Sequence, residues 1–287
     1  MTQLNLAVYA EGCMYPEPDP STLVNELKSS RFTTVILGLF HVSAAGDLYF
    51  NNEKICSQGA YVGAASWKGT VAALAEPKDG KQLTVCASVG GGGVSDFSNL
   101  RDIYAKNNAS FAGTELESNF KQLRASFPAV SIIDMDCEDT YDQPSLVAFC
   151  RLLAGMGFGL TFCPYTNQAF WVQALAQLND THPGTVRWWN LQCYDGGQGN
   201  QPSDWADIIR EHLPTFSTDG FILPGDWTND SPDQVQALMH GFAGKPSVGG
   251  GFMWTLGSMH GGDRSVAGYA LAMANGLQAA PGSARGE

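Results

Sequence analysis

Short apolar runs alternate with amphipathic stretches along this chain. Eight runs have the length and composition of strands, and most are apolar at nearly every position. Such runs are typical of parallel strands that are covered on both faces. The expected strands are Leu4–Tyr9, Thr33–Phe40, Leu83–Ser88, Ser131–Glu138, Gly159–Pro164, Val186–Tyr194, Gly220–Leu223 and Gly250–Thr255.

Helices fit between these strands, and their ends carry recognisable signals. Pro144 stands where a helix tolerates proline in its first turn, and Ser231 followed by Pro232 predicts an N-cap and a first turn. Gly157 and Gly276 are expected just past the C-terminal ends of two helices, because glycine adopts the left-handed conformation without strain.

The repeated alternation predicts an α/β fold, a single (β/α)8 TIM barrel over residues 1–278. Barrels of this kind commonly reach the 287 residues of this chain, so a second domain is not required. In the long connection 44–69, the run Gly46–Phe50 and the Asn pair after it suggest a small hairpin that shapes a ligand cleft. Residues 279–287 are small and polar, and we expect a disordered tail.

Charge narrows the possible partners. Sixteen basic residues against twenty-eight acidic ones give a net charge of −12, which repels nucleic acid and anionic lipid. The start of the chain has neither a basic segment nor a long apolar one, so we expect no signal peptide and no membrane span. A cytoplasmic protein, or a secreted one after trimming, fits this pattern, and we expect a monomer.

Seven cysteines are present without any CxxC pair, and several lie in apolar runs, so we expect mainly buried thiols. The five histidines are scattered without an HExxH pattern, which gives no support for a zinc site. We expect no metal and no cofactor, with magnesium on the acids as a minor alternative. The Gly90–Gly93 run lacks the Lys-Ser/Thr ending of a phosphate-binding loop.

Three acids lie along one face of the fourth expected strand. Asp134, Asp136 and Glu138 alternate with Met135 and Cys137, and alternate side chains of a strand share a face. Like charges about 7 Å apart in a dry site raise the pKa of at least one carboxyl, which keeps a proton available near neutral pH. The apolar start of this strand places the acids towards its C-terminal end, where barrel enzymes hold their catalytic groups.

The eight residues from Ser131 to Glu138 resemble the DxxDxDxE motif of family-18 glycoside hydrolases, with Ser131 in place of the first acid. By spacing, Ser131 faces away from the three acids. The run Ser88-Val-Gly-Gly is similar to the SxGG element of that family, and Gln192-Cys-Tyr-Asp to its (M/Q)xYD element. The eighth strand supplies Trp254.

The resemblance implies a retaining glycosidase in which the acetamido group of the substrate is the nucleophile. Glu138 would be the general acid and Asp136 would orient the acetamide. Tyr194 would donate to the acetamido oxygen, and Asp195 and Gln192 would line the same subsite.

The same resemblance implies a support for these groups. Asp134 would lie behind the acid pair and accept hydrogen bonds from Tyr9 and Ser88. Trp254 would be the apolar floor beneath the sugar, and Trp227, after the seventh strand, is a further candidate for stacking.

Three functions remain open at this stage. The first is a chitinase-like enzyme that cleaves β-1,4 bonds between N-acetylglucosamine units of chitin or related oligosaccharides in an endo fashion. The second is an endo-β-N-acetylglucosaminidase that acts on N-glycans. The third is a barrel that binds carbohydrate without cleaving it. The short connection after the seventh strand leaves no room for an inserted subdomain, and it predicts an open cleft on that side.

Overall fold

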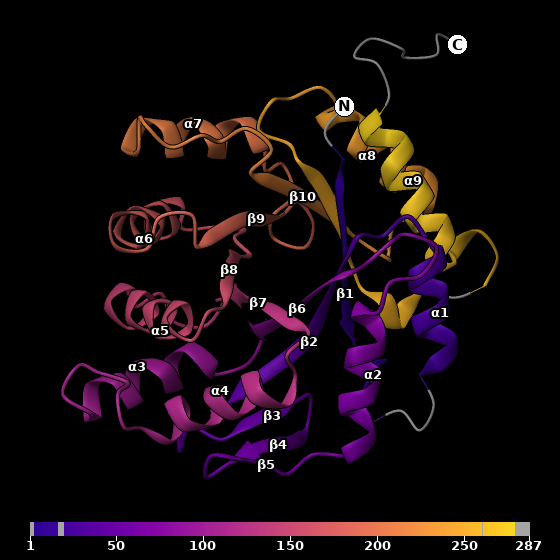
Figure 1. Cartoon of the computed structure of the whole chain (residues 1–287). Coiled ribbons are helices and arrows are strands. Elements are labelled where there is room, and N and C mark those ends of the chain that lie inside the picture. The colour runs from indigo at the N-terminus through magenta and orange to yellow at the C-terminus, as the bar shows by residue number, and fades with distance from the viewer. Residues whose placement is uncertain (1–2, 17–19, 260, 279–287) are drawn as a thin grey trace, which may run out of the picture.

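Eight parallel strands close into a barrel in the computed structural model, which describes residues 3–16, 20–259 and 261–278. Strand β1 pairs with β2 on one side and with β11 on the other, which closes the ring (Figure 1). The predicted (β/α)8 TIM barrel is therefore confirmed. Its strands are β1 (Asn5–Glu11), β2 (Thr34–Val42), β6 (Thr84–Gly90), β7 (Val130–Asp136), β8 (Gly159–Phe162), β9 (Val186–Gln192), β10 (Ile222–Trp227) and β11 (Gly250–Trp254).

Helices lie outside the ring of strands and cover it (Figure 1). One helix follows each barrel strand except β6, which is followed by two. The helices are α1 (Ser21–Ser29), α2 (Ala65–Ala75), α3 (Asp96–Lys106), α4 (Glu115–Ser126), α5 (Gln143–Gly155), α6 (Gln168–Thr181), α7 (Pro202–His212), α8 (Pro232–Phe242) and α9 (Val266–Gln278). The segment 279–287, predicted to be a tail, lies outside the described residues.

Three of the four predicted helix-end signals are confirmed. Pro144 lies in the first turn of α5, and Ser231 caps α8 in a capping box with Gln234. Gly157 follows the end of α5 with a φ of +83°. The prediction for Gly276 is wrong, because this residue lies inside α9, where a Cβ atom would stand 2.6 Å from the carbonyl oxygen of Gln236 on α8. Glycine is there to let two helices approach.

The long connection after β2 forms the predicted hairpin and adds a further strand to it. Strands β3 (Leu48–Phe50), β4 (Glu53–Ser57) and β5 (Ala60–Tyr61) continue the sheet from the edge of β2 in antiparallel order. None of the residues 44–69 lines the pocket described below, but Asn51 Oδ1 accepts a hydrogen bond from the backbone N–H of Leu39, which does. That the insertion shapes the cleft stays a prediction. Its apolar side chains pack on α2, where the ring of Phe50 lies 4.6 Å from that of Trp67.

The barrel interior has its own small core, separate from the larger one between strands and helices. It is built from inward-facing side chains of alternate positions: Ala7, Tyr9, Ile36, Cys86, Ile132, Cys163, Tyr194, Leu223 and Phe252. Six of the seven cysteines are buried, as expected, and Cys13 is partly buried. A filled interior forces any ligand to bind at an end of the barrel, because little space is left along its axis.

Candidate active site

Several barrel strands end on a polar or aromatic side chain, and these ends meet at one mouth of the barrel. Glu11, Asp136, Gln192, Trp227 and Trp254 are the last residues of β1, β7, β9, β10 and β11. A pocket of about 380 Å³ lies at this mouth. It is lined by Glu11, Leu39, His41, Gly92, Val94, Asp136, Glu138, Cys163, Gln192, Tyr194, Asp195 and Trp254.

Asp134 lies beneath this pocket with its side chain fully buried. Its Oδ2 accepts hydrogen bonds from the hydroxyls of Tyr9 and Ser88, both at 2.8 Å, as the family resemblance implied. Two further donors were missed: Thr161 Oγ1 at 2.6 Å and Asn190 Nδ2 at 3.0 Å, both to Oδ1. Burial raises the pKa of Asp134 while the four donors oppose that shift. An acceptor-only carboxylate satisfies all four donors.

Asp136 and Glu138 share one donor. The Nε2 atom of Gln192 lies 3.1 Å from Glu138 Oε1 and 3.3 Å from Asp136 Oδ1. Burial raises the pKa of Asp136 well above its usual range, and the neighbouring charges of Glu138 and Asp134 raise it further. This carboxyl therefore retains a proton at a pH where an exposed aspartate has lost it. The half-buried Glu138 lies above it, at the opening of the pocket.

An aromatic wall stands beside the carboxyls. Tyr194 lines the pocket, and burial raises the pKa of its phenol well above the usual value, so the hydroxyl stays a donor. Trp254, half-buried, also lines the pocket and contacts Tyr9 at 5.5 Å between ring centroids. Trp227 does not line the pocket. Its ring stacks on Tyr194 at 5.7 Å, so it supports the wall from behind.

Ser131 is exposed at the start of β7, on the outside of the barrel. The serine in place of the first motif acid is thus remote from the three acids that follow it.

A histidine–aspartate pair on the same pocket was missed. His41 Nδ1 lies 2.7 Å from Asp96 Oδ2, and Asp96 is buried. Because a carboxylate only accepts, Nδ1 carries the hydrogen, and Nε2 is left for a ligand in the pocket. The sequence offered little signal for this pair, since 55 positions separate the two residues. Glu11 and Cys163 were also missed, although the ends of β1 and β8 are places to look in any barrel.

The described part of the chain gives no sign of a metal centre or a membrane span. It contains no group of three or more His, Cys, Asp and Glu side chains placed to hold a metal ion. None of its helices has the length and apolar character needed to cross a bilayer.

No protein-family model and no curated protein sequence matches the chain. Solved structures do. A chitinase from Chromobacterium violaceum ATCC 12472 aligns over 96% of this chain and 100% of its own, with a TM-score of 0.59 and 13% identity. The catalytic domain of a family GH18 chitinase from the fern Peteris ryukyuensis aligns over 96% and 99%, with a TM-score of 0.58 and 15% identity.

A chitinase from Bacteroides thetaiotaomicron aligns over 96% of this chain and 97% of its own, with a TM-score of 0.61 and 12% identity. At such low identities the similarity concerns the path of the backbone. The alignments span nearly the whole chain, and no large part of this barrel lacks a counterpart in them. The protein therefore has the fold of the family-18 chitinases.

Proposed function

We propose that this protein is a chitinase-like glycosidase that cleaves β-1,4 bonds between N-acetylglucosamine units with retention of configuration. The observation that carries the proposal is the amide of Gln192, which contacts both Asp136 and Glu138 at the pocket. This amide holds the carboxyl of Asp136, which is buried and retains its proton, next to the carboxyl of Glu138, which a substrate in the pocket can reach. Paired carboxyls whose surroundings differ in this way suit acid catalysis on a glycosidic bond.

The proposed first step breaks the glycosidic bond. Glu138 gives its proton to the glycosidic oxygen, and the bond from that oxygen to the anomeric carbon breaks. The acetamido carbonyl oxygen of the same sugar attacks the anomeric carbon and closes an oxazolinium ring. In the second step water attacks that carbon from the opposite face and returns a proton to Glu138.

Asp136 and Tyr194 orient the acetamido group in this scheme. Asp136 accepts the acetamide N–H, and its own proton moves to Glu138, the neighbour whose charge raises its pKa. The phenol of Tyr194 donates to the carbonyl oxygen that attacks. Positioning of this kind supplies several kcal/mol of barrier reduction. The charge of Asp134 behind the pair disfavours a second negative charge on Asp136, so a proton stays on the Asp136–Glu138 pair until Glu138 donates it.

Other lining residues hold the sugar. Trp254 gives the apolar face for the pyranose ring, and Asp195 and Gln192 meet its polar groups. The free Nε2 of His41 binds a hydroxyl on the opposite side of the pocket. Trp227, stacked on Tyr194, keeps the aromatic wall in place.

The test is hydrolysis of chito-oligosaccharides and of a high-mannose glycopeptide by the wild type, Glu138→Gln and the exposed control Glu53→Gln. We expect cleavage of chito-oligosaccharides with the β-anomer as the initial product. Glu138→Gln should lose roughly 10²–10⁴-fold in kcat and keep its affinity for a chito-oligosaccharide, and Glu53→Gln should match the wild type.

Each other outcome overturns a part of the proposal. Cleavage of the glycopeptide alone replaces chitin by N-glycans as the substrate. An initial α-anomer contradicts the substrate-assisted mechanism. Sugar binding without turnover of either substrate by the wild type shows a carbohydrate-binding barrel.

A further inference from the structure

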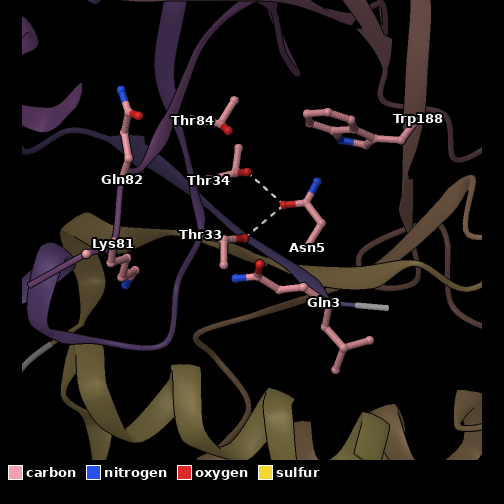
Figure 2. Close-up of a pocket in the computed structure, with 10 residues that line it drawn as sticks. Gln3, Asn5, Thr33, Thr34, Lys81, Gln82, Thr84 and Trp188 are labelled. Atoms are coloured by element: carbon pink, nitrogen blue, oxygen red, sulfur yellow. Dashed lines mark hydrogen bonds between the residues drawn. The ribbon is translucent and has the colours of Figure 1, made fainter. Parts of the chain in front are cut away.

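A second hollow lies at the opposite end of the barrel, where the strands begin (Figure 2). Asn5, Thr34 and Thr84 are the first residues of β1, β2 and β6, and all three line it. Its volume is about 420 Å³, in the range of small-molecule sites. The full lining is Gln3, Leu4, Asn5, Thr33, Thr34, Gly80, Lys81, Gln82, Thr84 and Trp188. None of these residues lines the candidate active site.

One amide in the hollow is held in a defined orientation. Asn5 Oδ1 accepts from Thr34 Oγ1 at 2.7 Å and from Thr33 Oγ1 at 3.1 Å. The amide nitrogen of Asn5 is thereby turned away from both threonines and towards Trp188 (Figure 2). A donor that is oriented before a ligand arrives loses little conformational entropy when it binds one.

Trp188 offers an apolar surface to the same space. Its Nε1 donates to Asn190 Oδ1 at 3.0 Å, so the polar atom of the indole already has a partner inside the barrel. The ring packs against the interior core and is half-buried, and its remaining carbon surface lines the hollow. A flat hydrocarbon face next to amide and hydroxyl groups suits a ligand with both C–H and O–H surfaces.

Charge in the hollow is low. No carboxylate is among its lining residues. The ammonium of Lys81 donates to the carbonyl oxygen of Ser30 at 2.6 Å and lies 3.5 Å from those of Leu27 and Lys28. These carbonyls at the C-terminal end of α1 hold the ammonium of Lys81, the one cation among the lining residues, so an anionic ligand would have to compete with them for it. A neutral ligand leaves these contacts in place.

We propose that this hollow is a second carbohydrate site, which binds one neutral pyranose unit. The C–H face of the ring packs on Trp188, and its hydroxyls accept from Asn5 and exchange hydrogen bonds with Thr84 and Gln82. The site lies across the barrel from the candidate active site, so it does not depend on the proposed catalytic function. In a barrel the N-terminal end is seldom used for chemistry, and this site would serve attachment.

The test is a titration of the protein with N-acetylglucosamine, glucose and glucuronate, followed by the NMR signals of the tryptophan indole N–H groups. The spectrum of Trp188→Phe lacks one of these signals, which identifies that signal as the one of Trp188. We expect both neutral sugars to shift that signal. Asn5→Ala and Gln82→Ala should each weaken binding at the hollow about tenfold. Gln173→Ala, at an exposed position of α6, is the matched control and should leave the dissociation constant unchanged.

Hydrolysis of chito-oligosaccharides by Gln82→Ala should equal that of the wild type, which separates the two sites. Gln82 is exposed, so this variant remains informative if Asn5→Ala fails to fold. A Trp188 signal that does not move at saturating neutral sugar overturns the proposal. So does equal affinity in Gln82→Ala and Gln173→Ala, or a higher affinity for glucuronate than for glucose.

Discussion

The side-chain amide of Asn190 donates to Asp134 Oδ1 across 3.0 Å, which joins β9 to β7 inside the barrel. On its other side, Asn190 Oδ1 accepts from Trp188 Nε1 at 3.0 Å. Indole nitrogen can only donate, so this contact decides which end of the amide faces Asp134. Asp134 Oδ1 must then accept, so Asn190 fixes the position of this carboxyl oxygen between β7 and β9.

The first prediction concerns the hydroxyl that Thr161 donates to Asp134. Thr161→Val keeps the shape of the side chain and removes a 2.6 Å hydrogen bond to a buried carboxylate. We expect a loss of roughly 1–3 kcal/mol in the free energy of unfolding at pH 7, since a buried acceptor loses a partner. Urea unfolding measures this loss. Thr215→Val, at an exposed position, is the control, and equal stabilities of the two variants would contradict the prediction.

The second prediction is the pH profile of hydrolysis. The pKa of Asp136 is raised, so its proton is held at low and moderate pH and lost as the pH rises. The proposed reaction needs that proton on the Asp136–Glu138 pair. We expect kcat/KM for a soluble chito-oligosaccharide to fall as the pH rises. The midpoint of this decline should lie well above about pH 4, where an ordinary carboxyl titrates.

Asp219→Asn, at an exposed position, should reproduce the wild-type profile, and Asp136→Asn should be strongly impaired at every pH. A decline of the wild-type kcat/KM centred near pH 4 would contradict the prediction. It would show that the Asp136–Glu138 pair loses its proton in the pH range of ordinary carboxyls.

The third prediction concerns Asp226, a buried acid outside the pocket. It is 1% exposed, and its Oδ2 has no hydrogen-bond partner among the described residues. Burial, with the charge of Asp230 as a smaller cause, raises its pKa to about 7. The folded state therefore binds this proton more tightly than the unfolded state. The resulting stability is complete below about pH 4, the ordinary range of an aspartate, and is lost as the pH rises from there to about 7.

Asp226→Asn removes that ionisation and keeps the acceptor for the backbone N–H of Trp227. We expect the variant to be more stable than the wild type by roughly 2–4 kcal/mol at pH 8, with little difference at about pH 4, where the unfolded chain also binds the proton. Denaturant unfolding at the two pH values measures both differences. A variant with the same stability difference at both would refute the proposed titration.

The fourth prediction tests the packing of α8 on α9. A Cβ atom at Gly276 would stand 2.6 Å from Gln236 O and 2.7 Å from Met239 Cβ. Gly276→Ala therefore forces the two helices apart, and we expect a loss of roughly 1–3 kcal/mol. Gly241→Ala on α8 meets no atom within 4 Å and should stabilise the protein by up to about 1 kcal/mol, since alanine favours helix. Thermal unfolding measures the stability of both variants. A Gly276→Ala variant as stable as the wild type would show that α8 and α9 separate easily.

The alternation of apolar runs and helical stretches was enough to predict the barrel, because every strand of a parallel barrel is covered on both faces and reads as apolar. The direction of Asp134 and Asp136 was equally accessible. Side chains alternate along any strand, whatever lies beside it. The contacts of Asp134 with Tyr9 and Ser88 came from the family motif, and the structure contains both.

Other features depended on which strands became neighbours and in what register. Thr161 and Asn190 reach Asp134 because barrel closure brings β8 and β9 to the same depth as β7, and nothing local in either segment marks that depth. The apolar side chains of the insertion after β2 pack on Trp67 of α2, a contact that only the tertiary structure defines. The sequence predicted a helix end at Gly276, because a glycine that lets two helices touch cannot be told in sequence from a glycine that ends a helix. The sequence by itself determined the elements and the direction of their side chains, and the tertiary structure decided which of those side chains met.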